Sequence, residues 1–427
     1  MLRLITGSAG TGKTGAVINE IKRGVENGQG GIMLIVPEQY SHEAERELCR
    51  RCGDRLSLYA EVLSFTGLAR KMAASCGGAA APWLDKGGRL LCMALALRDL
   101  GPRLRVYSAA QRRAELQSML LSAVDEFKAA CVGYSELSAA SAACADSLGD
   151  KLSELALIIE AYDAAVANGH ADPADRLSLL AQQIESCDFT DTRVYVDGFV
   201  DFTRQEREVL HALLRRGAEL TVCLTVDSLD GDSEIFELSR RAGRSLLAYA
   251  GEQGIETSVD SVDAQSGKAP ELRFFADNMF SYSAARWPEE CSALRLYRAG
   301  SMADECEQAA ALCLELVRDK HCRWRDIAIV ARGFEDYRGT LESVFRHYGV
   351  PLFTARRSDL MAKPLPALIS LAYEIIHGGW AVDDVVSYIR TGLAGPLLTL
   401  DDCDVLENYV FKWQLHGSAW RLSLIHI

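Results

Sequence analysis

An eight-residue segment near the amino terminus constrains the fold of this chain more than any other feature. It reads GSAGTGKT and meets the pattern G-x-x-x-x-G-K-[ST], with an apolar run before it (Leu2 to Thr6) and helical spacing after it (Lys13 to about Glu26). Glycines let backbone N–H groups turn toward phosphate oxygens, and the following helix directs its positive end at the same anion. The strand before the loop and the helix after it argue against a chance glycine-rich turn. We therefore predict that nucleotide phosphates bind Gly7, Ser8, Ala9, Gly10, Thr11, Gly12, Lys13 and Thr14.

The cofactor that this pattern implies is ATP with Mg²⁺. Lys13 is expected to reach the β- and γ-phosphates, and the Thr14 hydroxyl is expected to join the magnesium shell. A second strand has to supply an acid, and RVYVD places Asp197 at its carboxyl end, where ligands bind in open parallel sheets. We predict Thr14 and Asp197 as the metal ligands. The alternative for Asp197 is a cap of the next helix.

The residue after Asp197 bears on turnover. Motor ATPases usually place a glutamate there to orient the attacking water, whereas this chain has Gly198. Loss of a general base typically costs about 10²–10⁴-fold in rate. Glu206 and Glu208 are possible substitutes, but they lie about two helical turns further on. We assign no catalytic residue and expect a nucleotide binder with weak turnover.

The order of apolar runs predicts an α/β chain with a parallel sheet. Further strands are expected at Ile32 to Val36, Glu61 to Ser64 and Leu220 to Asp227, with helices between them. From about Lys86 to Leu180 the chain is rich in Ala and Leu at helical spacing, which predicts a helical insertion. Residues 228 to 270 are polar and predict an irregular segment.

A second α/β unit is predicted to begin near Leu294. It comprises a helix from Ala303 to Arg318, a strand from Ile327 to Ala331 and a helix from Tyr337 to Tyr348. Helical spacing returns after Leu365.

Composition narrows the class of protein. No apolar run reaches about 18 residues and no signal peptide is evident, so we expect neither a membrane span nor secretion. Thirteen cysteines without framework spacing suit a reducing cytoplasm, and the one close pair, Cys49 and Cys52, is interpreted as unligated thiols. The net charge of −13 argues against a chain coated in basic residues, yet it permits a local basic groove.

Several longer stretches resemble one bacterial family. IMLIVPEQYSHEAE (32 to 45), EVLSFTGLARK (61 to 71), VYVDGFVDFTRQE (194 to 206), DIAIVARGFEDYRGTLESVFRHYGVPLF (326 to 353) and LENYVFKWQLHGSAW (406 to 420) are similar to AddB, called RexB in some groups. AddB is the B subunit of the AddAB helicase–nuclease, and the resemblance runs from Met1 to about Trp420. In related active helicases the acidic motif reads approximately V-D-E-F-Q-D. Here its Glu and Gln positions hold Gly198 and Val200.

The resemblance implies a P-loop NTPase with two RecA-like domains of the superfamily 1, UvrD-like helicase type, each with a helical insertion. The implied domains are 1–85 with 186–290 (first RecA-like ATP-binding domain, 1A), 86–185 (helical insertion, 1B), 291–365 (start of the second RecA-like domain, 2A) and 366–421 (start of the second insertion, 2B). Residues 422–427 read LSLIHI, the translation of a sequencing-library transposon end, and are expected to be adapter-derived.

The resemblance also implies a function. It describes an ATP-binding and DNA-binding subunit that works on single- and double-stranded DNA, in a heterodimer with an AddA-type helicase–nuclease subunit. The complex processes double-strand breaks for homologous recombination, and the B subunit takes part in recognising the Chi sequence. The family's iron–sulfur cluster belongs to a C-terminal nuclease domain that this sequence lacks. The alternatives are an autonomous DNA-stimulated motor and, less compatible with the long insertion, a small-molecule kinase.

Four residues after the second and third strands are candidates for DNA contact. Ser64, Phe65 and Thr66 offer hydroxyl and aromatic groups to single-stranded DNA, and Gln39 lies just beyond the second strand. A strand-to-helix cap with Phe65 in the core is an equal alternative, as is a simple turn residue at Gln39.

Overall fold

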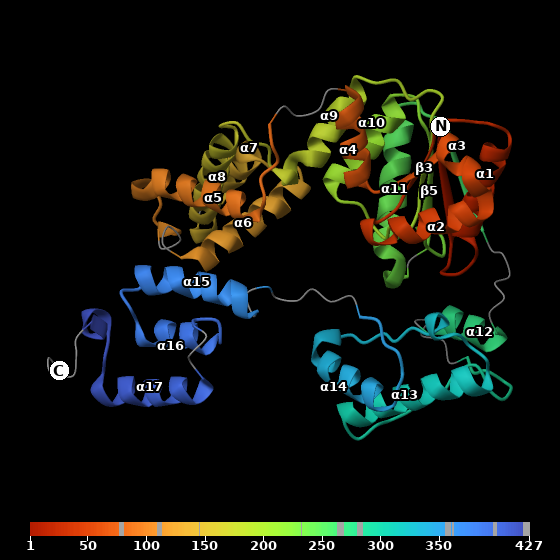
Figure 1. Cartoon of the computed structure of the whole chain (residues 1–427). Coiled ribbons are helices and arrows are strands. Elements are labelled where there is room, and N and C mark those ends of the chain that lie inside the picture. The colour runs from red at the N-terminus through yellow and green to blue at the C-terminus, as the bar shows by residue number, and fades with distance from the viewer. Residues whose placement is uncertain are drawn as a thin grey trace. The chain divides into compact units, whose positions relative to one another are not determined.

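The computed structural model describes residues 1–76, 81–108, 113–144, 146–231, 233–262, 269–279, 285–354, 360, 363–395 and 399–421. The chain divides into two compact units, Met1–Arg295 and Leu296–Ile427, which are described separately (Figure 1). The predicted adapter-derived tail, 422–427, lies outside the described residues.

A parallel sheet forms the centre of the first unit. Its order is β3-β2-β4-β5-β1-β6, and every pair of neighbouring strands runs parallel. The predicted α/β class with a parallel sheet is therefore confirmed. Because the strands are parallel, their carboxyl ends lie along one edge of the sheet. The strands are β1 (Leu2–Gly7), β2 (Ile32–Ile35), β3 (Ala60–Leu63), β4 (Arg193–Val196), β5 (Glu219–Thr225) and β6 (Thr257–Ser261).

Helices cover both faces of this sheet (Figure 1). Successive side chains of a strand point to opposite faces, so Leu4 packs in one apolar core and Ile5 in the other. Both residues are fully buried, which explains why the strands read as continuous apolar runs. One face carries α1 (Lys13–Glu26), α2 (Ser41–Cys52) and α3 (Leu56–Tyr59), and the other carries α4 (Phe65–Cys76), α9 (Arg176–Glu185), α10 (Arg204–Arg215) and α11 (Glu237–Glu252).

The predicted helical insertion consists of helices, as expected. They enclose a separate core to which Met93, Leu97, Val124 and Tyr162 contribute. Its helices are α5 (Lys86–Leu100), α6 (Ala114–Ala129), α7 (Tyr134–Ala143) and α8 (Ser147–Val166). The next helix, α9, lies within the range expected for the insertion, yet its buried residues join the core of the sheet.

The prediction of an irregular segment at 228 to 270 is wrong. This range contains α11 and β6. Helix α11 buries Ala242, Leu246 and Ala250 at four-residue spacing, and polar residues on its other face hide that stripe in the sequence. Strand β6 reads TSVDS because it lies at the edge of the sheet and pairs only with β1. The helix α12 (Pro270–Asn278) follows it.

The second unit is helical in its described residues. Helices α13 (Met302–Asp319) and α14 (Phe334–His347) share a small core, and α15 (Pro364–His377), α16 (Val382–Arg390) and α17 (Leu400–Trp413) follow. The strand predicted at Ile327 to Ala331 is wrong, because these residues form no β-structure. A strand needs a neighbouring strand to satisfy its N–H and C=O groups, and none of the described residues in this unit provides one. A second RecA-like domain stays a prediction.

Candidate nucleotide-binding site

The predicted phosphate loop connects β1 to α1 at the carboxyl edge of the sheet. The Lys13 side chain turns back over the loop, and its Nζ donates hydrogen bonds to the carbonyl oxygens of Gly7 at 2.7 Å and Ser8 at 2.8 Å. Thr11 Oγ1 donates to the Ser8 carbonyl at 3.0 Å. Gly12, with φ of 93°, starts the helix from a left-handed conformation that glycine adopts readily. The loop's own residues thus hold it in a compact turn.

The start of α1 suits an anion. No side chain caps this end of the helix, and its first turn contains no acidic residue. The backbone N–H groups at a helix start lack intrahelical partners and carry the positive end of the helix dipole. Lys13 is buried to 7% exposure, whereas Thr14 in the same turn is exposed. These residues fit a phosphate group.

The base of the loop admits only glycine at position 7. A Cβ atom there would lie 2.5 Å from the carbonyl oxygen of Val262 and 2.6 Å from Thr11 Oγ1. Val262 follows β6, and its N–H donates to the carbonyl of Thr6 at 2.8 Å. The edge strand that sequence analysis missed therefore borders the loop.

Asp197 directly follows β4 at the same edge of the sheet. Its backbone N–H donates to the carbonyl of Ile35 at 3.0 Å, and its side chain is buried. The capping alternative is not what the structure has, because Thr203 caps α10. Thr203 Oγ1 accepts from the Glu206 N–H, and the Glu206 carboxylate accepts from the Thr203 N–H at 2.8 Å. Glu206 is thereby engaged in a capping box rather than directed at the loop.

Cys223 links the two halves of the site, and sequence analysis missed it. It lies on β5, the strand between β4 and β1, and is 3% exposed. Burial raises the pKa of the Cys223 thiol, the Asp197 carboxylate raises it further through charge and a hydrogen bond, and the Lys13 ammonium opposes the rise. Asp197 and Lys13 thus have opposite effects on the pKa of one buried thiol, whose strand β5 lies between β4 and β1.

Gly198, which holds the usual position of the water-orienting glutamate, has a restricted backbone. Its φ is 86°, and a Cβ atom at this position would lie 3.1 Å from Pro37 Cδ. A side chain here would meet both an unfavourable conformation and the Pro37 ring.

The four candidate DNA-contacting residues differ in their surroundings. Gln39 is exposed in a short 3₁₀ turn, Glu38–Tyr40. Ser64 Oγ accepts from the N–H of Gly67 at 3.0 Å, as a helix cap does, and Thr66 is half-buried. Phe65 is 5% exposed, and its ring centroid lies 5.4 Å from that of Phe199. The geometry of Ser64 and Phe65 agrees with the cap-and-core alternative, and DNA contact stays a prediction for all four.

Within the described residues, no group of three or more His, Cys, Asp or Glu side chains could hold a metal ion. Magnesium in nucleotide sites is usually held by one or two protein ligands together with phosphate oxygens and waters. The assignment of Thr14 and Asp197 therefore stays a prediction. Cys49 and Cys52 both lie on α2 and form no disulfide, and their interpretation as unligated thiols stays a prediction. None of the described helices is both long and apolar enough to cross a bilayer.

Comparison with known proteins identifies relatives of this chain. It is 29% identical over 433 residues to the B subunit of the ATP-dependent helicase/deoxyribonuclease of Clostridium perfringens, and 32% identical over 434 residues to the protein of that name in Desulforudis audaxviator. Each alignment covers 98% of this chain, which spans 37% of the length of either relative. Residues 4–278 match the family model described as ADDB, N-terminal. The chain therefore belongs to the AddB N-terminal family.

Proposed function

We propose that this chain binds magnesium–ATP at residues 7 to 14 and forms the N-terminal, nucleotide-binding part of the B subunit of an ATP-dependent helicase/deoxyribonuclease. The observation that carries this proposal is the placement of Lys13 and Asp197. Both lie at the carboxyl edge of one parallel sheet, Lys13 at the start of the helix after β1 and Asp197 directly after β4, with β5 between these two strands. Ligands bind at this edge in open α/β sheets, at the ends of the strands.

Each residue has a stated role in this proposal. Backbone N–H groups of the loop bind phosphate oxygens, and the Lys13 ammonium exchanges its two carbonyl partners for the β- and γ-phosphates. Thr14 and Asp197 hold Mg²⁺, which neutralises phosphate charge. This assignment makes residues 1–85 with 186–290 the first RecA-like domain of a P-loop NTPase.

Weak turnover follows from Gly198. Fast hydrolysis usually relies on a carboxylate that orients water. Gly198 carries none, Glu206 is engaged in its capping box, and Glu208 lies beside His211 on the same helix, at 3.8 Å. We therefore propose a nucleotide-gated binding subunit rather than an autonomous motor.

The relatives' names extend the proposal to the whole protein. The B subunit of a helicase/deoxyribonuclease acts beside at least one other subunit, and we propose an AddA-type helicase–nuclease as that partner. DNA, single- and double-stranded, is the proposed substrate, with double-strand break repair by homologous recombination and Chi recognition as the proposed role. An iron–sulfur cluster is proposed only for the C-terminal part of the longer proteins. The free thiols of the described cysteines suit a cytoplasmic protein.

The test is magnesium–ATP binding and hydrolysis by the chain, with and without single-stranded DNA, beside Lys13→Ala. Lys13→Ala is expected to weaken ATP binding about tenfold or more, because hydrogen bonds to charged groups are worth about 1.5–3 kcal/mol. Lys22→Ala is the matched control, because Lys22 is a half-buried residue of the same helix that pairs with Glu26 rather than with the loop.

Three outcomes separate the alternatives. Binding that depends on Lys13, with little turnover in either condition, supports the proposal. Turnover strongly stimulated by DNA would favour the motor. Absence of binding by folded protein would reject the nucleotide site.

A further inference from the structure

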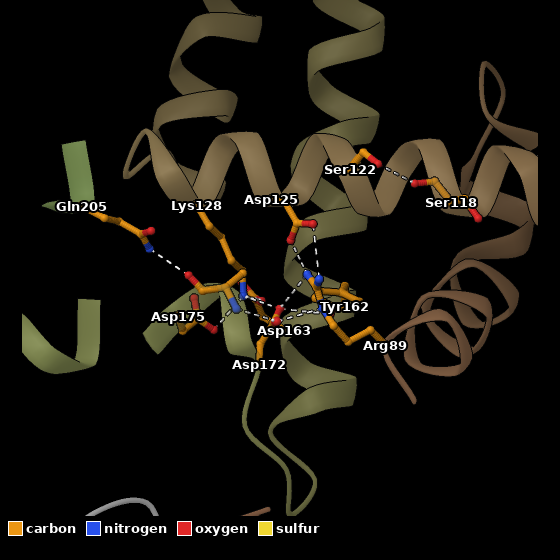
Figure 2. A network of polar contacts seen from close by, with 11 residues as sticks. Arg89, Ser118, Ser122, Asp125, Lys128, Tyr162, Asp163, Asp172, Asp175 and Gln205 are labelled. Atoms are coloured by element: carbon orange, nitrogen blue, oxygen red, sulfur yellow. Dashed lines mark hydrogen bonds and ion pairs between the residues drawn. The ribbon is translucent and has the colours of Figure 1, made fainter. Parts of the chain in front are cut away.

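Helix α10 begins seven residues after Asp197, and its second residue contacts the segment that joins α8 of the helical insertion to α9. Gln205 is 6% exposed, and its amide Nε2 donates to the carbonyl oxygen of Ala174 at 2.9 Å and to Ser178 Oγ at 3.0 Å. A glutamine amide nitrogen carries two hydrogens, so both donors are used. Figure 2 shows Gln205 reaching from its helix toward the turn that contains Asp175.

Ala174, whose carbonyl oxygen accepts from Gln205, is also bound through its backbone N–H. Ala174 lies in the 3₁₀ turn Pro173–Asp175, and its N–H donates to Asp172 Oδ1 at 3.0 Å. The Asp172 side chain has no exposed surface. One residue thus joins α10 to a buried carboxylate.

Asp172 in turn binds three helices of the insertion (Figure 2). It accepts from Tyr162 on α8 at 3.0 Å, pairs with Arg89 on α5 at 2.9 Å and pairs with Lys128 on α6 at 3.1 Å. Lys128 also pairs with Asp175 of the same turn at 2.7 Å. We call Arg89, Lys128, Tyr162 and Asp172 the hinge cluster. Breaking a buried ion pair is costly. The hinge cluster therefore ties Asp172, and with it the turn at 173–175, to α5, α6 and α8 of the insertion.

The segment between Asp197 and Gln205 makes close contacts with residues of the sheet's core and of neighbouring helices. Gly198 lies against Pro37, and the Phe199 ring packs between Phe65 and Phe202 with centroid distances of 5.4 and 5.3 Å. The Val200 carbonyl accepts from Ser239 Oγ of α11 at 2.8 Å. The segment that joins Asp197 to α10 is therefore packed against its neighbours rather than forming a loose loop.

We propose that Gln205 is a positioning residue that transmits nucleotide binding at Asp197 to the helical insertion, through Ala174 and the hinge cluster. This inference rests on the proposed nucleotide site. Magnesium–nucleotide binding fixes Asp197, α10 follows, and Gln205 carries the change to the turn at 173–175. Such coupling is reciprocal. If the nucleotide changes the affinity of the insertion for a ligand by some factor, that ligand changes the affinity for the nucleotide by the same factor.

Hydrogen exchange of the chain, with and without magnesium–ATP, tests this inference. In the unaltered protein, magnesium–ATP is expected to change exchange both at residues 7–16 and at residues 171–178. Gln205→Met keeps the side-chain length and removes both donors, and it is expected to retain the change at 7–16 and to lose the change at 171–178. Ser178→Ala, which removes one acceptor, is expected to reduce the second change.

The control is Gln182→Met, an exposed residue on the neighbouring helix α9, which is expected to behave as the unaltered protein. An unchanged response at 171–178 in Gln205→Met would overturn the inference. So would a response at 7–16 in the unaltered protein without one at 171–178. Absence of any response at 7–16 would instead reject the nucleotide site, and the inference with it.

Discussion

Gly198 lies so close to the Pro37 ring that a side chain at position 198 would be crowded. A Cβ atom added to Gly198 would lie 3.1 Å from Pro37 Cδ, and the Gly198 φ of 86° is one that other residues adopt at a cost. Pro37 and Gly198 each lie two residues beyond the end of a strand, β2 and β4 respectively, and these two strands are paired. Any residue other than glycine at the usual position of the water-orienting glutamate would therefore meet an unfavourable φ and a close Pro37 ring.

Gly198→Glu is not expected to create a motor. The left-handed conformation should destabilise the protein by about 1–2 kcal/mol, and relief of that strain moves the new carboxylate away from its intended place. ATP turnover with single-stranded DNA, together with urea unfolding, measures both effects.

Gly198→Ala separates backbone strain from the carboxylate, because it brings the same strain without the charge. A large gain in turnover for Gly198→Glu, absent from Gly198→Ala, would contradict this expectation and show that the site lacks only the carboxylate.

Asp197→Asn is expected to remove the magnesium dependence of ATP binding. The substitution deletes one negative charge from the proposed metal shell, so affinity with Mg²⁺ should fall about tenfold or more, while affinity in EDTA should stay unchanged. Titration with a fluorescent ATP analogue in both conditions measures the difference. Asp201→Asn is the control. Asp201 lies four residues after Asp197 and pairs with Arg241 at 3.2 Å. Equal losses with Mg²⁺ and with EDTA would argue that Asp197 supports the fold rather than the metal.

Asp172→Asn is expected to destabilise the protein by about 3 kcal/mol, because it removes the fully buried counter-charge that Arg89 and Lys128 share. The other partners of these two cations, Asp125, Asp163 and Asp175, are partly exposed and compensate for only part of the loss. Asp163→Asn removes a half-exposed partner of Lys128 and should cost about 1 kcal/mol or less. Urea unfolding followed by circular dichroism measures both. Comparable losses for the two variants would mean that Asp172 is not the centre of the hinge cluster.

His211 is expected to make stability depend on pH. Its ring stacks on Tyr249 at a centroid distance of 3.6 Å, and burial lowers its pKa. Because the unfolded state then binds more protons, the free energy of unfolding should fall as pH drops through the ordinary histidine value of about 6.5 toward the lowered folded pKa.

His211→Phe retains the stacked ring and removes the titration. The difference in unfolding free energy between the two proteins, measured from pH 8 to pH 5, cancels the contributions of other groups. A difference that does not change with pH would refute the assignment to His211.

Local sequence patterns determined much of the first unit. GSAGTGKT and its flanks predicted β1 and α1 closely, and RVYVD placed Asp197 at the end of a buried strand. These signals succeed because they act over a few residues: glycine conformations, helical spacing and strand burial are short-range properties. The sequence patterns did not predict the polar edge strand β6 or the half-polar helix α11, since neither shows a continuous apolar run.

The second unit shows the opposite error, a predicted strand that the structure does not have. Ile327 to Ala331 has the apolar composition of a strand, yet it forms none in the described structure. Composition makes a segment able to pair, but hydrogen-bonding partners from elsewhere decide whether it does.

The sequence by itself determined the loop, the acid and the missing glutamate, and thereby the kind of site to expect. Only the tertiary structure decided that the strand of Cys223 lies between β4 and β1, that Gly198 lies near Pro37, and that Gln205 binds Ala174. The physical reason is separation along the chain. The last two contacts join residues about 160 and 31 positions apart, and no local spacing encodes which distant segments the sheet and the insertion bring together.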